Sequence, residues 1–154
     1  MEFEPANRRH AQSYVAVQFI ILALLVLVSN RVGFQFRKFG YVGTLCEAFG
    51  TLGFLLSANV MRSTLTAIPI PKPDGKLSTS GLYKYVRHPM YSSVLLFCLG
   101  LALRSGSLYK YLLTLALAVL FYFKSAYEEK YLLEKYPEYQ GYAERVPRFI
   151  PFTK

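Results

Sequence analysis

The chain has 154 residues, of which 53% are hydrophobic and only 18% are charged, and its net charge is +9. The apolar residues come in blocks rather than at amphipathic spacing, which indicates an integral membrane protein of one domain. The basic residues flank these blocks instead of covering one face, and no nucleic-acid motif is present. We therefore expect contact with anionic lipid headgroups and no binding of nucleic acid.

Two membrane helices are predicted in the first 61 residues. Residues 11–30 carry no charge, and a helix of this length, at ~1.5 Å per residue, can cross a hydrocarbon core of ~30 Å. The run ends in Leu-Val-Ser-Asn-Arg without the small-x-small pattern of a signal-peptide cleavage site, so we expect a retained helix. A second helix is predicted from about Phe39 to Met61, and Gly50 and Gly53 within it favour close helix packing. Residues 1–61 are thus predicted to form a two-helix scaffold.

A polar loop is predicted at residues 62–88. Its alternating prolines between Ile68 and Gly75 cannot continue a helix and favour an extended backbone. The loop ends at Pro89, which suits the first turn of a helix because its missing N–H would have no partner there. Arg87 and His88 then stand at a helix N-terminus, where free N–H groups and partial positive charge favour a carboxylate or phosphate.

Residues 89–123 are predicted to form a helical hairpin. Two short apolar runs, Pro89–Leu103 and Tyr111–Phe123, are separated by a short polar turn, so both arms return to the same side. The second arm is expected to continue as an amphipathic helix to Tyr136, where Pro137 ends it. Whether the hairpin crosses the whole bilayer stays open.

The distribution of Lys and Arg predicts the topology. The amino-terminal segment holds 2 of them, residues 62–88 hold 5 and residues 124–154 hold 6, whereas the two other connections hold 3 and 2. The positive-inside rule then places both termini, the 62–88 loop and a cap formed by residues 124–154 on the cytoplasmic side.

Three groups of polar residues are predicted to meet on that face, at the start of the hairpin, at the end of its second arm and in the tail. They are Arg87, His88 and Tyr91, then Glu128 and Glu129, then Tyr139, Tyr142 and Arg145. Together they offer anion donors, carboxylates and aromatic faces, which would suit a ligand that carries both a carboxylate and cationic groups. The two cysteines lie in separate apolar stretches, so neither a metal site nor a disulfide is predicted.

Four motifs carry a resemblance to a known family. They are Gly81-x-Tyr83 through Arg87-His88-Pro89-Met90-Tyr91, Glu128-Glu129-x-x-Leu132, Tyr139-x-x-Tyr142 and Val146-Pro147-Arg148. In this order and spacing they resemble the isoprenylcysteine carboxyl methyltransferase family, and the first two also resemble the related membrane phospholipid N-methyltransferases. The resemblance covers roughly residues 75–152. It departs at Ser93, where relatives commonly have Gly two residues after the motif tyrosine.

The resemblance implies an all-α membrane bundle of about four transmembrane helices, in one methyltransferase domain over residues 1–154. It implies S-adenosylmethionine as the cofactor, bound by the 124–154 cap together with the hairpin start, and a lipid-like or prenylated substrate from the bilayer. Cofactor contacts are implied for Tyr85, Arg87, His88, Tyr91, Glu128, Glu129 and Tyr139, and catalytic roles for Glu129, Tyr142 and Arg145.

The alternative functions differ first in the chemical group that accepts the methyl group. We favour carboxyl O-methylation of an isoprenylcysteine-type acceptor, because the tail motif matches that group better and Arg145 could orient an ionised carboxylate. Phospholipid ethanolamine N-methylation is the alternative, and it requires a base such as a glutamate. Two further classes remain, a sterol-reductase-like NADPH oxidoreductase and a non-catalytic membrane adaptor. For Arg148 we favour contact with lipid headgroups, and Lys124 and Glu128 could form an ordinary helical charge pair.

Overall fold

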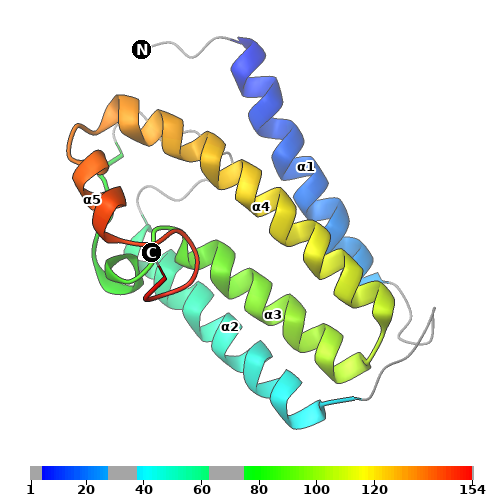
Figure 1. Ribbon diagram of the computed structural model, residues 1–154. Helices are drawn as coiled ribbons and strands as arrows, with labels where there is room; N and C mark the ends of the chain where they lie inside the picture. Colours follow the sequence, from blue (N-terminus) through cyan, green and yellow to red (C-terminus); the bar gives the residue numbers. More distant parts are fainter. Residues whose placement is uncertain (1–4, 28–37, 63–74, 154) are drawn as a thin grey trace.

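The computed structural model describes residues 5–27, 38–62 and 75–153, and over these ranges it is a helical bundle without strands (Figure 1). The helices are α1 (Pro5–Leu27), α2 (Gly40–Val60), α3 (Pro89–Ser105), α4 (Leu108–Lys135) and α5 (Tyr139–Arg145), with a single 3₁₀ turn, η1 (Gly81–Lys84). Three of them, α1, α2 and α4, are long and apolar enough to cross a membrane, and α3 is apolar but shorter. The predicted all-helical membrane bundle is confirmed.

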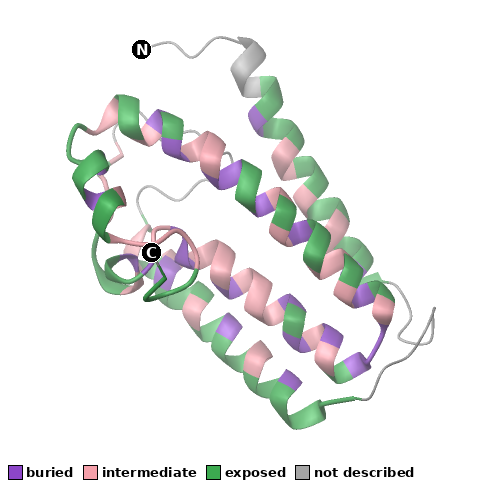
Figure 2. Cartoon of the chain, in the orientation of Figure 1, coloured by how far each residue is buried: buried purple, intermediate pink, exposed green. Residues whose placement is uncertain are grey.

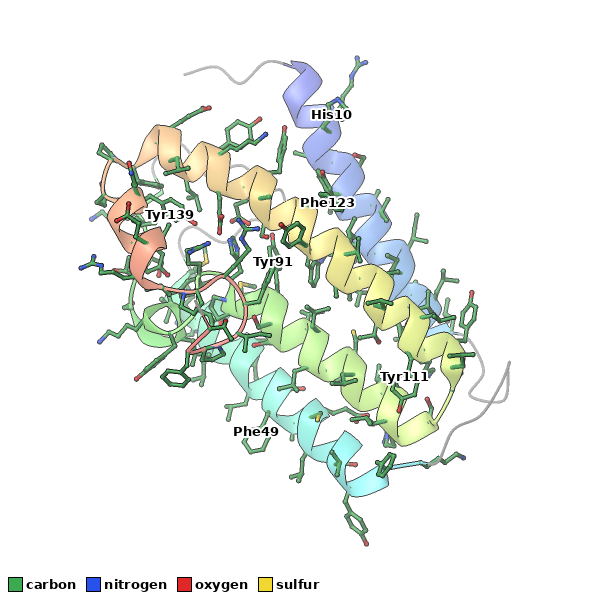
Figure 3. All side chains as sticks on the ribbon, in the orientation of Figure 1. His10, Phe49, Tyr91, Tyr111, Phe123 and Tyr139 are labelled. Carbon is green, nitrogen blue, oxygen red and sulfur yellow. The ribbon has the colours of Figure 1, made fainter. Side chains whose placement is uncertain are left out.

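The outer faces of the long helices are apolar. Large hydrophobic side chains such as Leu27 on α1, Phe49 and Leu55 on α2 and Leu115 on α4 are exposed. Figure 2 shows that much of α1 and α2 is exposed in this way, and Figure 3 shows the ring of Phe49 pointing away from the bundle. An apolar surface of this extent is unfavourable in water and matches the hydrocarbon core of a bilayer.

Helices α2 and α3 pack with their backbones in direct contact. A Cβ added to Gly50 would lie 2.7 Å from the backbone N of Phe97, and one added to Gly100 would lie 2.6 Å from the carbonyl oxygen of Gly43. A Cβ at Gly53 would lie 2.6 Å from Ser93 Oγ, so this glycine makes room for the serine that departs from the family pattern. The close helix contact predicted at Gly50 and Gly53 is confirmed, because only small residues allow such an approach.

The hairpin of α3 and α4 closes through a tight turn. Gly106 follows α3 with a φ of 71° and donates its N–H to the carbonyl of Ala102, as a left-handed residue does when it ends a helix. Helix α4 then runs back past α3 to Lys135 and ends before Pro137, as predicted, while α1 packs along α4 (Figure 1). The buried core of the bundle includes Leu25, Cys98, Leu117 and Phe121.

Two predicted connections fall largely outside the described residues. These are the proline-rich part of the 62–88 loop, at residues 68–74, and most of the short connection after α1. The division of the chain into scaffold, loop, hairpin and cap, and the cytoplasmic orientation, stay predictions.

Candidate active site

The start of α3 is held by the carboxyl-terminal segment. His88 is the N-cap residue of α3, with φ −123° and ψ 60°, and Pro89 occupies the first turn, as predicted. The N–H of Arg87 donates to the carbonyl of Pro147 (2.9 Å), and the N–H of His88 donates to that of Arg148 (3.0 Å). The tail of the chain therefore lies directly against the start of the hairpin.

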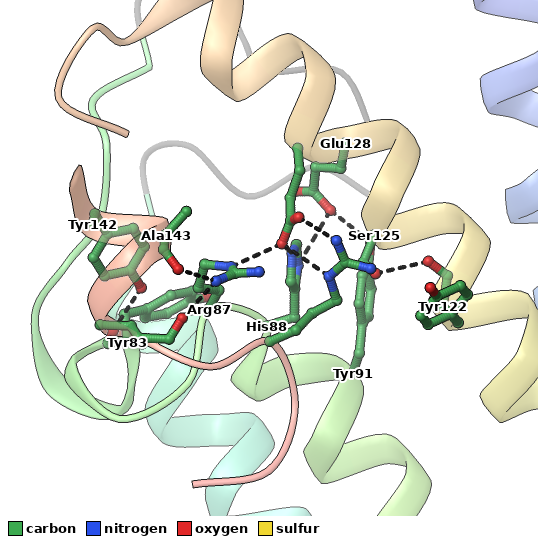
Figure 4. A network of polar contacts seen from close by, with 12 residues as sticks. Tyr83, Arg87, His88, Tyr91, Tyr122, Ser125, Glu128, Tyr142 and Ala143 are labelled. Atoms are coloured by element: carbon green, nitrogen blue, oxygen red, sulfur yellow. Dashed lines mark hydrogen bonds and ion pairs between the residues drawn. The ribbon is translucent and has the colours of Figure 1, made fainter. Parts of the chain in front are cut away.

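A buried ion-pair cluster joins the three predicted segments (Figure 4). Glu129 Oε1 lies 2.9 Å from Arg87 Nε and 3.0 Å from His88 Nε2, and Glu129 Oε2 lies 2.5 Å from Arg148 Nη2. Arg87 Nη1 also donates to the backbone carbonyls of Ala143 (2.6 Å) and Val146 (2.5 Å). We call Arg87, His88, Glu129 and Arg148 the Glu129 cluster. The anion site predicted at the helix start is thus filled by a carboxylate of the chain itself.

The neighbouring Glu128 has different partners. Tyr91 donates its hydroxyl to Glu128 Oε2 (3.0 Å), and His88 Nδ1 lies 3.6 Å from the same oxygen. The imidazole of His88 therefore stands between the two glutamates, with one ring nitrogen toward each. The ring also stacks on Tyr91, with centroids 5.4 Å apart, so its orientation is fixed on three sides.

A cavity of about 580 Å³ opens beside Glu128. At one end its wall is polar and includes His88, Tyr91 and Glu128. Toward the middle of the bundle the wall is apolar, with Leu22 of α1 and Phe97 of α3 among the residues that form it. The volume falls within the range of roughly 300–1,000 Å³ typical of small-molecule and cofactor sites.

Two tyrosines of α5 line the polar end of the cavity. Tyr142 donates its hydroxyl to the carbonyl of Tyr83 (2.6 Å), and burial, opposed by Arg87 and reinforced by Glu129, raises the pKa of this phenol to about 12. Tyr139 is only 2% exposed, and its hydroxyl has no hydrogen-bond partner among the described residues. Burial, with the nearby Glu129 carboxylate, raises the pKa of Tyr139 well above its usual range. Both phenols therefore stay protonated at neutral pH.

Two residues that the sequence proposed for the site do not reach the cavity. Arg145 is exposed on α5, and its Nε donates to the carbonyl of Gly141 (2.9 Å) within the same helix. Tyr85 is 55% exposed and does not line the cavity. The structure brings together the other predicted residues, Arg87, His88, Tyr91, Glu128, Glu129, Tyr139 and Tyr142, although Glu129 lies in its cluster and not on the cavity wall.

Three further residues belong to this region, although the sequence did not predict them as site residues. Arg148, for which contact with lipid headgroups was favoured, pairs instead with Glu129. Lys124 and Gln18 both line the cavity, and the Lys124 ammonium donates to Gln18 Oε1 (2.6 Å) rather than pairing with Glu128. The signal that could have identified Lys124 is its position directly after the apolar run Tyr111–Phe123, because ionisable residues in membrane helices usually face a cavity or a partner.

Comparison with known proteins relates the chain to a family and to a curated relative. Residues 39–139 match the model of the phospholipid methyltransferase family. The chain is also 33% identical over 138 residues to CzcN, a cobalt-zinc-cadmium resistance protein of Cupriavidus metallidurans, in an alignment that covers 89% of this chain and 61% of that protein. The chain therefore spans less than two thirds of the length of this relative.

The name of that relative concerns metal ions. In residues 5–27, 38–62 and 75–153, no three His, Cys, Asp or Glu side chains come close enough together to hold one. The family model, by contrast, spans more than half of the chain and includes the start of α3, both glutamates and Tyr139. The resemblance drawn from the sequence motifs is confirmed, and the chain belongs to the phospholipid methyltransferase family, which includes the isoprenylcysteine carboxyl methyltransferases.

Proposed function

We propose that the protein is an S-adenosylmethionine-dependent methyltransferase that acts on a lipid-like acceptor from the membrane. The observation that carries this proposal is a single cavity that joins a polar end, at Glu128 and Tyr139, to an apolar wall formed by the membrane helices. The apolar wall suits the hydrocarbon tail of an acceptor, and the polar end suits a cofactor with charged groups. Membership of the phospholipid methyltransferase family supports methyl transfer to such a substrate.

The residues at the polar end fit the cofactor. S-adenosylmethionine carries an ammonium, a carboxylate, ribose hydroxyls and an adenine ring, and when bound it supplies an activated methyl group. Glu128 can accept hydrogen bonds from the ammonium or the ribose. Tyr139 offers a buried hydroxyl without a partner among the described residues, and such groups normally find one. The ring faces of Tyr139 and Tyr142 can contact the adenine.

The chain contributes orientation and exclusion of water. Methyl transfer from a sulfonium requires the donor and the nucleophile to be in line more than it requires acid–base help. His88 is held between the two glutamates, so it presents Nδ1 to the side of Glu128 while Nε2 stays in the Glu129 cluster. We therefore assign Glu129 a positioning role, in place of the catalytic role that the sequence suggested, and Glu128 the contact with the cofactor or acceptor.

The chemical group of the acceptor that receives the methyl group is a separate question. The sequence favoured an isoprenylcysteine carboxylate oriented by Arg145, but this arginine is exposed and outside the cavity wall. Glu128, a possible base for an amine, lines the cavity. This arrangement favours amine methylation as a second candidate, because an amine must lose a proton before or during the transfer and a carboxylate acceptor need not.

Incubation with radiolabelled cofactor tests the proposal. The full chain, reconstituted in lipid nanodiscs, is given S-adenosylmethionine labelled on the methyl group with either a prenylated cysteine or phosphatidylethanolamine. We expect label in one of the two lipids, and its loss in Glu128→Gln but not in Arg145→Ala. Label in the prenylated cysteine alone would restore the first candidate. Tight binding of NADPH, with no label in either lipid and no binding of S-adenosylhomocysteine, would overturn the methyltransferase proposal in favour of an oxidoreductase.

A further inference from the structure

Lys124 is a buried cation inside a helix that can span the membrane. Its side chain is only 2% exposed, although it lies at the junction between the apolar run of α4, which ends at Phe123, and the charged last part of that helix. The ammonium donates to Gln18 Oε1 of α1 (2.6 Å) and lies 5.2 Å from the centre of the Tyr91 ring. Both Lys124 and Gln18 line the cavity.

In the described part of the chain the charge of Lys124 has no carboxylate in direct contact, and Glu128, one turn further along α4, acts on it only at longer range. Arg87 and Arg148 face Glu129, and Arg104 faces Glu47, but none of the ion pairs includes Lys124. Gln18 offers a neutral amide oxygen, and an ammonium has three N–H donors. A buried charge without a counter-charge in contact is costly, and the Tyr91 ring face and the more distant Glu128 offset only part of that cost.

The position of Lys124 along the cavity indicates what could complete the pair. On α4 the cavity wall runs from Phe121, at the apolar part, through Lys124 to Glu128 at the polar end. Lys124 and Glu128 are one helical turn apart, about 6 Å along the axis. A lipid whose reactive group reaches Glu128 and whose tail lies along Phe121 would place the intervening part of its head beside Lys124.

We propose that Lys124 and Gln18 form a subsite that binds an anionic oxygen group in the head of the acceptor lipid, either a phosphodiester or a carboxylate. The identity of this ligand as the methyl acceptor rests on the proposed function, whereas the binding of an acidic lipid does not. Lys124 supplies the charge, and the Gln18 oxygen holds the ammonium in place while its amide N–H₂ offers further donors. The subsite would then prefer lipids that carry a negative charge next to the hydrocarbon tail over neutral lipids with the same tail.

Lipid binding to the full chain tests this subsite directly. Two matched pairs of radiolabelled probes share the same tail: dioleoyl phosphatidic acid with dioleoylglycerol, and palmitic acid with hexadecanol. We expect the wild-type protein to prefer the acidic member of at least one pair by about tenfold or more, as hydrogen bonds to charged groups contribute. The pair that shows the preference identifies the acidic group as a phosphate ester or a carboxylate.

Matched variants assign the preference to Lys124. Lys124→Met keeps the length of the side chain without its charge, and we expect it to reduce the preference to less than twofold. Gln18→Glu gives Lys124 an internal anion and should have the same effect while the lysine stays. Lys110→Met is the control, because Lys110 is also buried in α4 but does not line the cavity, and it should keep the preference. A wild-type protein without preference, or a folded Lys124→Met with an unchanged preference, would refute the subsite.

The outcome is separable from that of the proposed function. Binding of S-adenosylhomocysteine, measured on the same samples, should be unchanged in Lys124→Met, whereas the KM for an acidic acceptor should rise about tenfold or more. A protein that selects acidic lipids through Lys124 but neither binds S-adenosylhomocysteine nor transfers methyl groups would keep the subsite and refute the methyltransferase proposal. A protein that transfers methyl groups, but whose KM for the acceptor is the same in Lys124→Met as in the wild type, would keep the methyltransferase proposal and refute the subsite.

Discussion

Two adjacent carboxylates of α4 have opposite environments. Glu129 is buried among Arg87, His88 and Arg148, which come from the start of α3 and from the tail. Glu128 lies on the cavity wall, with the Tyr91 hydroxyl as its hydrogen-bond donor. Successive residues of a helix point about 100° apart, so one glutamate faces the tail and the other faces the cavity. Glu129 therefore belongs to a cluster that holds the segments of the site together, whereas Glu128 belongs to a cavity wall that a ligand can contact.

Removal of Glu129 should break the cluster and have the largest effect on stability. Glu129→Ala leaves three cationic or donor groups without their shared carboxylate, and we expect a loss of about 3–5 kcal/mol in the free energy of unfolding. Glu128→Ala should cost much less, because it removes one hydrogen bond from Tyr91 and a longer contact, of 3.6 Å, with His88. Thermal unfolding of both variants in detergent checks this difference, and equal losses would contradict the separation.

Arg148 should have the next largest effect. Its guanidinium contacts both oxygens of Glu129, at 3.2 Å from Nε and 2.5 Å from Nη2, and it is partly exposed. We expect Arg148→Ala to cost about 1.5–3 kcal/mol, as hydrogen bonds to charged groups do. Arg148→Lys, which keeps the charge but not the two-point contact, should recover only part of the loss in the same unfolding assay. Full recovery would mean that charge alone holds the tail.

Tyr139 tests the cavity side of this comparison, because its hydroxyl should affect ligand binding and not stability. Its hydroxyl has no partner in the described part of the chain, so Tyr139→Phe should leave the free energy of unfolding unchanged or slightly higher. If the hydroxyl contacts the cofactor, the same variant should bind S-adenosylhomocysteine about five- to tenfold more weakly. Calorimetric titration measures this, and an unchanged affinity would remove Tyr139 from the cofactor site.

The pH dependence of the free energy of unfolding should reflect the raised pKa of Tyr142. Its pKa is about 12 in the folded chain and about 10 when unfolded, so the folded protein holds the proton longer. The stabilisation is complete below pH 10 and is lost as the pH rises from 10 toward 12. Unfolding curves between pH 8 and 12 should therefore fall less steeply for Tyr142→Phe than for the wild type. Parallel curves would show that Tyr142 is not the group responsible.

Arg145 should show the smallest effect. It is exposed and, among the described residues, its side chain bonds to the backbone of its own helix, so Arg145→Ala should change stability by no more than about 0.5 kcal/mol. We also expect methyl transfer to stay within twofold of the wild type. A loss of activity without a loss of stability would return Arg145 to the catalytic role that the sequence suggested.

The elements of the fold were predictable because local signals define them. Continuous apolar runs predicted α1 and α2, while Pro89 and Pro137 marked the start of α3 and the end of α4. The glycines of α2 predicted its close contact with α3. The meeting of the hairpin start, the glutamates and the tail followed from the hairpin topology, which returns both arms to one end.

The roles of neighbouring residues were less predictable, because they depend on how each helix is rotated against its neighbours. No local signal distinguishes Glu128 from Glu129 as the one that faces the cavity. Arg148, and not Arg145, contacts Glu129 because α5 ends at Arg145 and the extended chain from Val146 then turns Arg148 toward that carboxylate. The contact between Lys124 and Gln18 joins helices far apart in the sequence, which only the packing of α1 on α4 determines.

Calorimetric titration of the purified full chain with S-adenosylhomocysteine tests the central claim most directly. We predict binding by the wild type, weakening of at least tenfold in Glu128→Gln, and an unchanged unfolding temperature for that variant. Absence of binding by a folded wild-type protein, or full affinity in Glu128→Gln, would contradict the assignment of the cavity beside Glu128 to the cofactor.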